Sequence, residues 1–360
     1  MAPRRSKSRW PRRLLFALAL ALLLFIGLLW WPYRGYAEEA TVFIESGMSR
    51  RTIADRLAEQ GVLRSRWPFL LYAYAQPGRT LKAGEYSFDQ PLSAAAVFTK
   101  LERGEVHLYP LVIPEGYTRW DIATEVERLG LASREAFLRA TENRRLIHVL
   151  APQAKNLEGF LFPDTYHFAR PSDPNLMVRA MVARFEREWN ELQPAAAPPL
   201  ALTPHELVTL ASLVEKETGV PQERGLVAAV FYNRLEKKMV LACDPTVIYA
   251  ERMEKGGWFD GEINVSDLER RSPYNTYLNA GLPPGPIASP GRAALEAVLK
   301  PPKSNYLFFV SNSQGGHLFS AASGEHSRNV ARYRRQRERD SRPTQPQRRT
   351  GGASKSRRGT

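Results

Sequence analysis

The hydrophobic and polar positions of the chain separate one long apolar run from a series of short helices and strands. Residues 14–31 (LLFALALALLLFIGLLWW) are 18 consecutive residues without a charged or strongly polar side chain. As a helix this run spans about 27 Å, close to the thickness of the hydrocarbon core of a bilayer. The pattern therefore predicts a transmembrane helix over residues 14–33, with Trp30, Trp31 and Tyr33 at one membrane interface.

The charges before this helix predict its orientation. Residues 1–13 carry six Lys or Arg and no acid, so we expect this basic segment to stay in the cytoplasm. A cleaved signal peptide is the competing interpretation, but the apolar run is long for one, and no small-x-small cleavage site precedes Glu38 and Glu39. The expected arrangement is a single-pass protein of the inner (plasma) membrane, with the chain from residue 38 on the periplasmic or extracytoplasmic side.

Two copies of one short pattern follow the apolar run. Residues 42–63 (VFIESGMSRRTIADRLAEQGVL) align with residues 111–131 (LVIPEGYTRWDIATEVERLGL) at an offset of 69 positions. Each copy predicts a strand, a glycine turn, a helix capped by Ser49 or Thr118, and a glycine stop. Two copies do not make a solenoid, so we expect small α+β modules.

Other segments are less sharply defined. Residues 81–89 predict a strand and residues 92–105 predict a helix that ends at Gly104. Residues 133–200 read as helices with loops, in which 194–199 (PAAAPP) is a linker or an exposed turn. The segment 334–360 is basic with almost no apolar residues and predicts disorder, either without a role or adhering to anionic lipid heads or wall polymers.

One helix near the middle of the second half is well specified. It begins with Thr203, Pro204 and Glu206, which form a capping box with proline at the first helical position. Apolar residues then recur at i, i+3, i+4 and i+7 and predict one buried face: Leu207, Leu210, Ala211 and Val214. The helix is expected to reach about Thr218, just before Gly219.

This helix ends with two carboxylates two positions apart. At 100° per residue Glu215 and Glu217 point about 200° apart, so only one of them can serve a given site. Glu217 lies over Leu213 and other apolar residues, a setting that raises a carboxyl pKa and suits a general acid near neutral pH. The pattern favours Glu217. It leaves open that Glu215 assists or replaces it, or that both are solvated residues of a last helical turn.

The distribution of charge excludes one class of function. The net charge is +14, but residues 1–13 contribute +6, and residues 328–360 carry twelve Lys or Arg against two acids, so the body between them has a net charge of −2. A nucleic-acid-binding face would concentrate basic charge in the body, so no nucleic-acid partner is expected. Cys243 is the only cysteine, expected to be a small buried side chain, and the histidines show no HExxH spacing. We expect no metal and no other cofactor.

Several long motifs together carry a resemblance. They are similar to the YceG-like endolytic murein transglycosylases, which are membrane-anchored enzymes that cut peptidoglycan glycan strands. The resemblance covers roughly residues 14–333 and rests on LEGFLFPDTYHF (157–168), EKETGVPQERGLVAAVFYNRL (215–235), CDPTVIYA (243–250), SPYNTYLNAGLPPGPIASPG (272–291) and YLFFVSNSQGGHLFS (306–320).

The shared G-x-[ST]-x-x-x-I-A pattern of the two copies also resembles the LysM module, which binds N-acetylated sugars of peptidoglycan and chitin. Together the resemblances imply a LysM-like α+β module over residues 38–110 and an α+β YceG-like catalytic domain over residues 111–333, with the acid on a helix. An ordinary strand-turn-helix remains the alternative to LysM.

The YceG-like resemblance implies both a reaction and a catalytic residue. In that family the catalytic group is a glutamate followed by a hydroxyl residue, which matches Glu217 and Thr218. Its carboxyl group would protonate the oxygen between N-acetylmuramic acid and N-acetylglucosamine, then accept the proton of the muramic C6 hydroxyl as a 1,6-anhydro ring closes. No second acid is required, in contrast to the paired carboxylates of a typical glycoside hydrolase.

Residues in the other motifs are candidates for binding the sugar. Amide and hydroxyl groups can hydrogen-bond sugar substituents, tyrosines can stack on pyranose rings, and arginine can meet a substrate carboxylate. Asp244 is the best candidate for a second acid, or it caps a turn before Pro245. We expect His317 and His326 to be packing or surface residues. The predicted substrate-binding residues are Thr218, Asn233, Arg234, Asp244, Tyr249, Tyr274, Asn275, Thr276 and Tyr277.

The family resemblance also implies partners. These are peptidoglycan glycan strands and peptidoglycan synthases, with cleavage ending nascent strands. Two other functions fit the same residues: a muramidase that hydrolyses the same bond, and a non-catalytic peptidoglycan-binding scaffold in which the LysM-like module acts alone.

Overall fold

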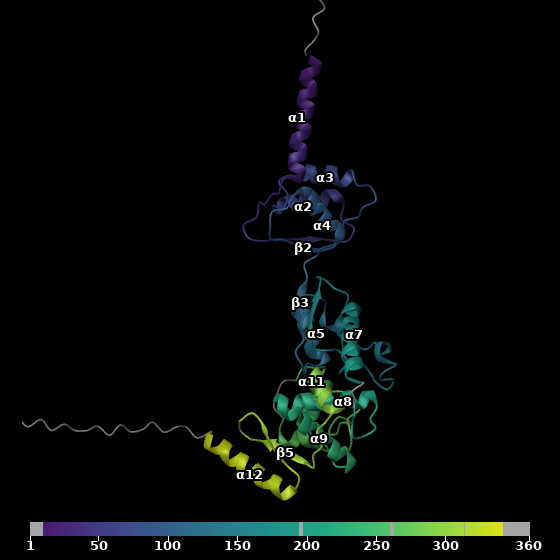
Figure 1. Cartoon of the computed structure of the whole chain (residues 1–360), viewed down its shortest axis with the longest axis vertical. Coiled ribbons are helices and arrows are strands. Elements are labelled where there is room, and N and C mark those ends of the chain that lie inside the picture. The colour runs from purple at the N-terminus through teal and green to yellow at the C-terminus, as the bar shows by residue number, and fades with distance from the viewer. Residues whose placement is uncertain (1–9, 194–196, 260–262, 313, 341–360) are drawn as a thin grey trace, which may run out of the picture. The chain divides into compact units, whose positions relative to one another are not determined.

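The computed structural model describes residues 10–193, 197–259, 263–312 and 314–340 (Figure 1). The chain forms two compact units. Unit 1 comprises Met1–Leu146 and Leu161–Arg184, and unit 2 comprises Ile147–Phe160 and Phe185–Thr360. Helices and short antiparallel strands occur in both units, which confirms the predicted α+β class.

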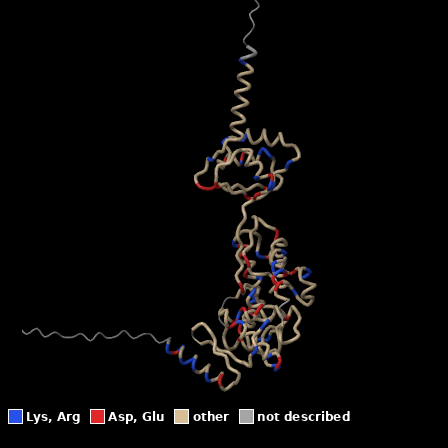
Figure 2. Tube along the Cα trace, viewed as in Figure 1, with Lys and Arg blue, Asp and Glu red and all other residues tan. Residues whose placement is uncertain are grey.

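Helix α1 (Trp10–Trp30) contains the long apolar run. In the part of the chain that the structure describes, it is the one helix long and apolar enough to cross a membrane, with a mean hydropathy of 2.4 over Arg13–Trp30. Figure 2 shows no charged residue along it beyond its first turns. It ends ahead of Pro32, whose ring and missing N–H do not continue a helix. Most of the basic segment 1–13 lies outside the described residues.

The first repeat copy forms a small module within unit 1. Strand β1 (Ala40–Ile44) pairs antiparallel with β2 (Gly84–Phe88), and α2 (Arg50–Glu59), α3 (Arg66–Tyr74) and α4 (Ala94–Arg103) complete it. Buried side chains such as Val42, Leu57 and Phe98 form its core. The predicted strand and helix between the copies are confirmed, and Gly104 ends α4 in the left-handed region that favours glycine.

The second copy repeats the same local structure. Strand β3 (Tyr109–Val112) leads through a glycine turn into α5 (Arg119–Arg128), whose cap Thr118 forms a capping box with Asp121. This confirms the strand-turn-helix prediction for both copies, since Ser49 caps α2 in the same way. Helix α6 (Arg134–Thr141) and the 3-10 helix η1 (Arg144–Ile147) follow.

The prediction of helices and loops over residues 133–200 is incomplete. Strand β4 (Thr165–Phe168) lies in this region and pairs antiparallel with β3, with Leu111 opposite Tyr166. Four residues carry too little periodicity to mark a strand, and β4 is held by its partner far along the chain. Helix α7 (Pro174–Leu192) begins in unit 1 and ends in unit 2. Part of the predicted linker, residues 194–196, lies outside the described residues.

Unit 2 is built around helix α8 (Pro204–Glu217), which contacts α9, α10 and α11. Strands β5 and β6 form an antiparallel hairpin that contacts α12, and β5 also contacts α9. The other elements are η3 (Pro221–Glu223), α9 (Arg224–Glu236), α10 (Asp244–Glu254), η4 (Val265–Glu269), α11 (Arg292–Leu299), β5 (Phe308–Ser311), β6 (His317–Ser320) and α12 (Ser323–Asp340).

Helix α12 corrects the prediction of disorder for residues 334–340, the first part of the segment 334–360. The helix continues through Asp340, because Arg, Gln and Glu are good helix formers and its beginning packs on the β5–β6 hairpin. Figure 2 shows basic residues along it. Residues 341–360 lie outside the described residues. The compact units also divide the chain at other positions than the predicted boundary between residues 110 and 111.

Candidate active site

Helix α8 begins as the sequence predicts. The Thr203 hydroxyl accepts a hydrogen bond from the backbone N–H of Glu206, and the Glu206 carboxylate accepts one from the backbone N–H of Thr203. Pro204 occupies the first turn. The helix ends at Glu217 with Thr218 as its cap, so both glutamates lie in its last turn. The C-terminal end of this helix therefore carries the two candidate acids.

Glu215 is held by other parts of unit 2. Its carboxylate forms an ion pair of 3.2 Å with Arg224 and accepts a hydrogen bond of 2.9 Å from the backbone N–H of Gly291. Its side chain is 5% exposed and that of Arg224 is 12% exposed. Glu215 thus joins the end of α8 to the start of α9 and to the cap of α11, as a structural residue would.

Glu217 has different surroundings. The pKa of its carboxyl group is raised to about 7, mainly by burial. The negative charge of Asp244 also raises this pKa, whereas the Cys243 thiol, His317 and Arg234 lower it. The thiol of Cys243 donates a hydrogen bond to this carboxyl group. A carboxyl group with a pKa near 7 exists in both forms at neutral pH, as a group that must act as acid and then as base requires.

Three predicted site residues lie around Glu217. Arg234 and Tyr277 both interact electrostatically with its carboxyl group. The Tyr277 hydroxyl donates a hydrogen bond to Asp244, the first residue of α10. Burial raises the pKa of Tyr277 and lowers that of Arg234, although the neighbouring Glu217 favours the charged arginine. The structure therefore brings together Glu217, Arg234, Asp244 and Tyr277.

Arg234 is also fixed by the backbone. Its guanidinium donates hydrogen bonds of 2.7 Å to the carbonyl oxygens of Leu307 and Leu241. These bonds hold its charge in place beside the acid, between β5 and the segment before α10.

Two further residues of the cluster were not among the predicted site residues. Cys243 is fully buried and caps α10, directly before Asp244. His317, expected to be a packing or surface residue, begins β6; its Nδ1 lies 2.7 Å from the Glu223 carboxylate, and its electrostatic interaction lowers the pKa of Glu217. Both lie far from Glu217 in the sequence, and no spacing rule links them. The one available signal is that each lies at the start of an element inside a family motif, Cys243 as the N-cap of α10 and His317 as the first residue of β6.

Four other predicted residues are engaged in holding backbone. Thr218 accepts a hydrogen bond from the N–H of Val220. The Asn233 amide donates to two carbonyl groups before β5, and the buried Asn275 amide donates to the carbonyls of Leu268 and Arg270. The Thr276 hydroxyl accepts a hydrogen bond of 3.0 Å from the N–H of Cys243. These contacts shape the loops that carry the residues around Glu217.

The two remaining predicted tyrosines form a pair of their own. The rings of Tyr249 and Tyr274 lie 4.9 Å apart at 46°. Tyr249 is buried, and its hydroxyl donates a hydrogen bond of 3.2 Å to Glu158. The segment around Glu158 packs closely on the proline-rich loop, because a Cβ at Gly159 would lie 2.4 Å from the Pro286 side chain. This pair therefore joins residues 147–160 to the loop that follows Tyr274.

Across residues 10–193, 197–259, 263–312 and 314–340, no group of three or more His, Cys, Asp or Glu side chains is placed to hold a metal ion.

Fold and site together define a class: a mixed helix and strand protein whose site is centred on one carboxylic acid of raised pKa at the end of a helix. The YceG-like family matches residues 42–332, and the chain belongs to this family. The match begins in β1 and ends in α12, so it spans both units.

Relatives with curated names agree with this family. The chain is 33% identical over 307 residues to the endolytic murein transglycosylase of Bacillus subtilis (strain 168). This match covers 81% of this chain and 83% of that protein. It is 32% identical over 320 residues to the endolytic murein transglycosylase of Streptococcus pneumoniae (strain ATCC BAA-255 / R6), and the match covers 81% of this chain and 58% of that longer protein.

A solved structure confirms the fold. The crystal structure of a yceG-like protein from Listeria monocytogenes matches with a TM-score of 0.54 and 32% sequence identity, over 81% of this chain and 98% of that one.

Proposed function

We propose that the protein is an endolytic lytic transglycosylase of peptidoglycan. It cuts the bond between N-acetylmuramic acid and N-acetylglucosamine without water and leaves 1,6-anhydro-N-acetylmuramic acid ends. The observation that carries the proposal is Glu217, a single carboxyl group whose pKa is raised to about 7, in a chain of the YceG-like family whose curated relatives bear this activity in their names.

The raised pKa lets one residue perform both proton transfers. Protonated Glu217 donates its proton to the bridging glycosidic oxygen as the bond from that oxygen to the muramic C1 breaks. The resulting carboxylate then accepts the proton of the muramic C6 hydroxyl, whose oxygen bonds to C1. The acid is regenerated in each cycle, and positioned proton transfer of this kind contributes about 10²- to 10⁴-fold to a rate.

We assign different roles to the residues around Glu217. Arg234 and Tyr277 face the acid, and we propose that they contact the sugar or its carboxylate substituents. Thr218, Asn233, Asn275 and Thr276 would act through the loops that they hold. Tyr274, packed against buried Tyr249, would offer an aromatic surface to the glycan.

A muramidase remains the second candidate, and Asp244 is the observation that favours it. Its carboxylate lies close enough to Glu217 to raise the pKa of that group, as the second acid of a hydrolase would. The hydrogen bond from Tyr277 holds Asp244 in place at the start of α10. The two candidates differ in the chemistry of the cut end, which is anhydro in one case and reducing in the other.

We further propose that α1 anchors the chain in the inner (plasma) membrane, with the N-terminus in the cytoplasm and the chain from residue 38 on the periplasmic or extracytoplasmic side. The length and hydropathy of α1 support the anchor, and the basic residues before it support the orientation. The module of residues 38–110, which contains β1, α2, α3, β2 and α4, would bind glycan strands as a LysM-like module. Peptidoglycan synthases as partners rest on the family resemblance alone.

The decisive experiment digests purified glycan strands with the full chain in detergent and identifies the product ends by mass spectrometry. Wild type, Glu217→Gln and Glu215→Gln are compared at equal amounts of folded protein. We expect anhydro ends from wild type and from Glu215→Gln, and a loss of about 10²- to 10⁴-fold in Glu217→Gln.

Other outcomes would contradict the proposal in distinct ways. Reducing ends would identify a muramidase. Loss of cleavage only in Glu215→Gln would move the acid two residues back. Intact strands that still bind to the wild-type chain would leave a non-catalytic scaffold.

A further inference from the structure

The end of α1 is packed into the module that follows it. Leu29, in the last turn of α1, is 8% exposed and belongs to the core of that module. The N–H of Tyr33 donates a hydrogen bond of 3.1 Å to the carbonyl of Leu92, and the N–H of Gly35 donates one of 2.9 Å to the carbonyl of Gly61. The module is therefore fixed directly at the end of the apolar helix, without a free tether between them.

Helix α3 lies across this end of α1, as Figure 1 shows, and the two helices are in contact. One face of α3 packs into the module core through Phe69, Leu70 and Ala73. The opposite face carries Trp67, Leu71 and Tyr74, at positions i, i+4 and i+7, which are 58%, 53% and 64% exposed. A short helix with one buried face thus presents a second apolar stripe to its surroundings.

Arginines accompany the aromatic rings on this side of the module. The guanidinium carbon of Arg66 lies 4.8 Å from the centre of the Trp67 ring, and that of Arg50 lies 6.0 Å from the centre of the Tyr74 ring. The guanidinium carbon of Arg64 lies 5.0 Å from the ring centre of Tyr33, just after α1. Aromatic rings with cationic neighbours are the composition found where a protein meets lipid headgroups.

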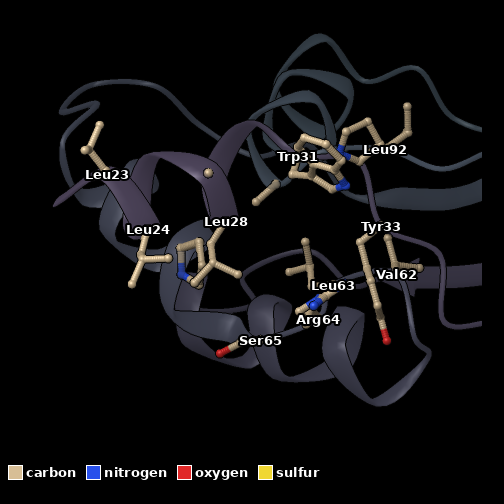
Figure 3. Close-up of a pocket in the computed structure, with 14 residues that line it drawn as sticks. Leu23, Leu24, Leu28, Trp31, Tyr33, Val62, Leu63, Arg64, Ser65 and Leu92 are labelled. Atoms are coloured by element: carbon tan, nitrogen blue, oxygen red, sulfur yellow. The ribbon is translucent and has the colours of Figure 1, made fainter. Parts of the chain in front are cut away.

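A pocket of about 310 Å³ lies between α1 and the module. Figure 3 shows Leu24 and Leu28 of α1 on one side and Val62 and Leu63 on the other. Arg64 and Ser65 add polar groups to the lining. The apolar walls suit a hydrocarbon chain, and the charge of Arg64 suits a phosphate group, so the pocket has the two chemical features of a phospholipid site.

We propose that α3 and this pocket form a lipid-binding face that rests on the outer leaflet of the bilayer crossed by α1. The inference depends on the proposed anchoring of α1. Membrane lipid is the partner proposed for this face because the stripe of α3 lies beside the end of α1. Trp30 and Trp31 end the apolar run there, at the level of the membrane interface. The module is then held flat on the membrane by two elements, one crossing it and one lying in its surface.

Spin labels on single introduced cysteines test the proposal in the full chain, reconstituted into vesicles of phosphatidylcholine and phosphatidylglycerol. Leu71→Cys and Tyr74→Cys probe the stripe, Leu22→Cys probes the interior of α1, and Thr41→Cys is the matched exposed position on β1 of the same module. Cys243 is fully buried, so the unsubstituted chain serves as the labelling control.

Accessibility to oxygen, which concentrates in lipid, is compared with accessibility to a water-soluble nickel chelate. We expect the labels at positions 71 and 74 to favour oxygen, as the label at 22 does, and the label at 41 to favour the chelate. If the label at position 22 lies in lipid while the labels at 71 and 74 respond like the label at 41, the proposal of a lipid-binding face is wrong. The proposed membrane anchor would then still stand.

Two further outcomes would also overturn the inference. A label at position 22 that is open to the chelate would refute the anchor itself. Labels at 71 and 74 that are shielded from both reagents would show that protein, such as a second copy of the chain, covers the stripe.

Discussion

Glu215 and Glu217 both lie in the last turn of α8, about 200° apart around the helix axis, and their carboxyl groups meet opposite environments. Glu215 is neutralised by Arg224 and by the N–H of Gly291, whereas Glu217 enters a region of low polarity that raises its pKa. Desolvation favours the uncharged form of a carboxyl group, and an ion pair favours the charged form. Their chemistry at neutral pH therefore differs although their sequence setting is nearly the same.

The raised pKa of Glu217 predicts a pH-dependent cost to stability. Because its pKa rises from 4.5 to about 7 on folding, the folded chain binds this proton more tightly than the unfolded chain. The stabilisation that the bound proton contributes is complete below 4.5 and is lost as the pH rises through about 7. Glu217→Gln stays uncharged, so we expect it to unfold at a higher temperature than wild type above pH 7.

Thermal unfolding at several pH values measures this effect. The difference between Glu217→Gln and wild type should shrink as the pH falls toward 4.5. The matched variant Glu215→Gln removes the charge that pairs with half-buried Arg224, and its free energy of unfolding should fall by about 1–3 kcal/mol above and below pH 7 alike. A constant difference for Glu217→Gln at every pH would contradict a raised pKa.

The same pKa predicts the pH dependence of cleavage. The first step needs protonated Glu217, so the rate should fall as the pH rises through about 7. Asp244→Asn removes a charge that raises this pKa and should move the falling limb to lower pH, whereas Cys243→Ala removes a donor that lowers it and should move the limb upward. Rates of anhydro-end formation over a pH series report both shifts, and shifts of the same sign would argue against this cluster.

Among the helices and strands, the sequence predicted a boundary well where a side chain caps a helix. Ser49, Thr118 and Thr203 each cap the helix that the pattern placed after them, and Gly104 ends α4. These signals are local, because cap and helix lie within a few residues of each other. Strand β4 had no such signal, since its pairing partner β3 lies more than 50 positions earlier.

Helix α10 illustrates how one element depends on another. The Thr276 hydroxyl accepts from the N–H of Cys243 and pairs with the Thr246 hydroxyl at 2.9 Å, so a loop residue holds the start of the helix that faces Glu217. We expect Thr276→Val to cost about 1–3 kcal/mol, because a buried N–H loses its acceptor, and to slow cleavage in the fraction that remains folded.

Denaturant unfolding and cleavage assays check this expectation. Thr99→Val is the matched control, since the Thr99 hydroxyl donates to the carbonyl of Ala95 within α4 of unit 1 and is remote from α10 in sequence. The free energy of unfolding of Thr99→Val should differ from that of wild type by about 0.5 kcal/mol or less. Equal effects of the two variants would show that the loop does not hold α10 in place.

Across the whole molecule, the distribution of charge and the one long apolar helix distinguish the basic ends and the membrane helix from the body of the chain. The basic excess lies at the two ends, and the body between them is nearly neutral. The apolar helix is compatible with a membrane anchor, and each unit has its own buried residues. The structure adds that the residues after α1 are not a linker, because they pack into the first module.

This packing predicts the effect of two truncations. A chain of residues 38–360 lacks buried Leu29 and the hydrogen bonds of Tyr33 and Gly35, whereas a chain of residues 29–360 retains them. We expect the shorter chain to have a module less stable by roughly 3 kcal/mol, from one buried leucine and two hydrogen bonds.

Thermal unfolding of both chains tests this, with cleavage as the control. Both should cleave glycan strands equally, because the residues around Glu217 belong to unit 2. Indistinguishable unfolding curves would mean that residues 29–37 contribute nothing to the module.

The amino-acid pattern was enough to predict features that depend on near neighbours: the apolar helix, the repeated strand-turn-helix, the capped start of α8 and the pair of candidate glutamates. Folding had to be known to see which carboxylate is paired and which is desolvated, and that Cys243, Arg234, Tyr277 and His317 gather around Glu217. The difference lies in the range of the interactions. Caps and periodicity act within a few residues, whereas burial and electrostatics depend on groups that folding brings together from distant parts of the chain.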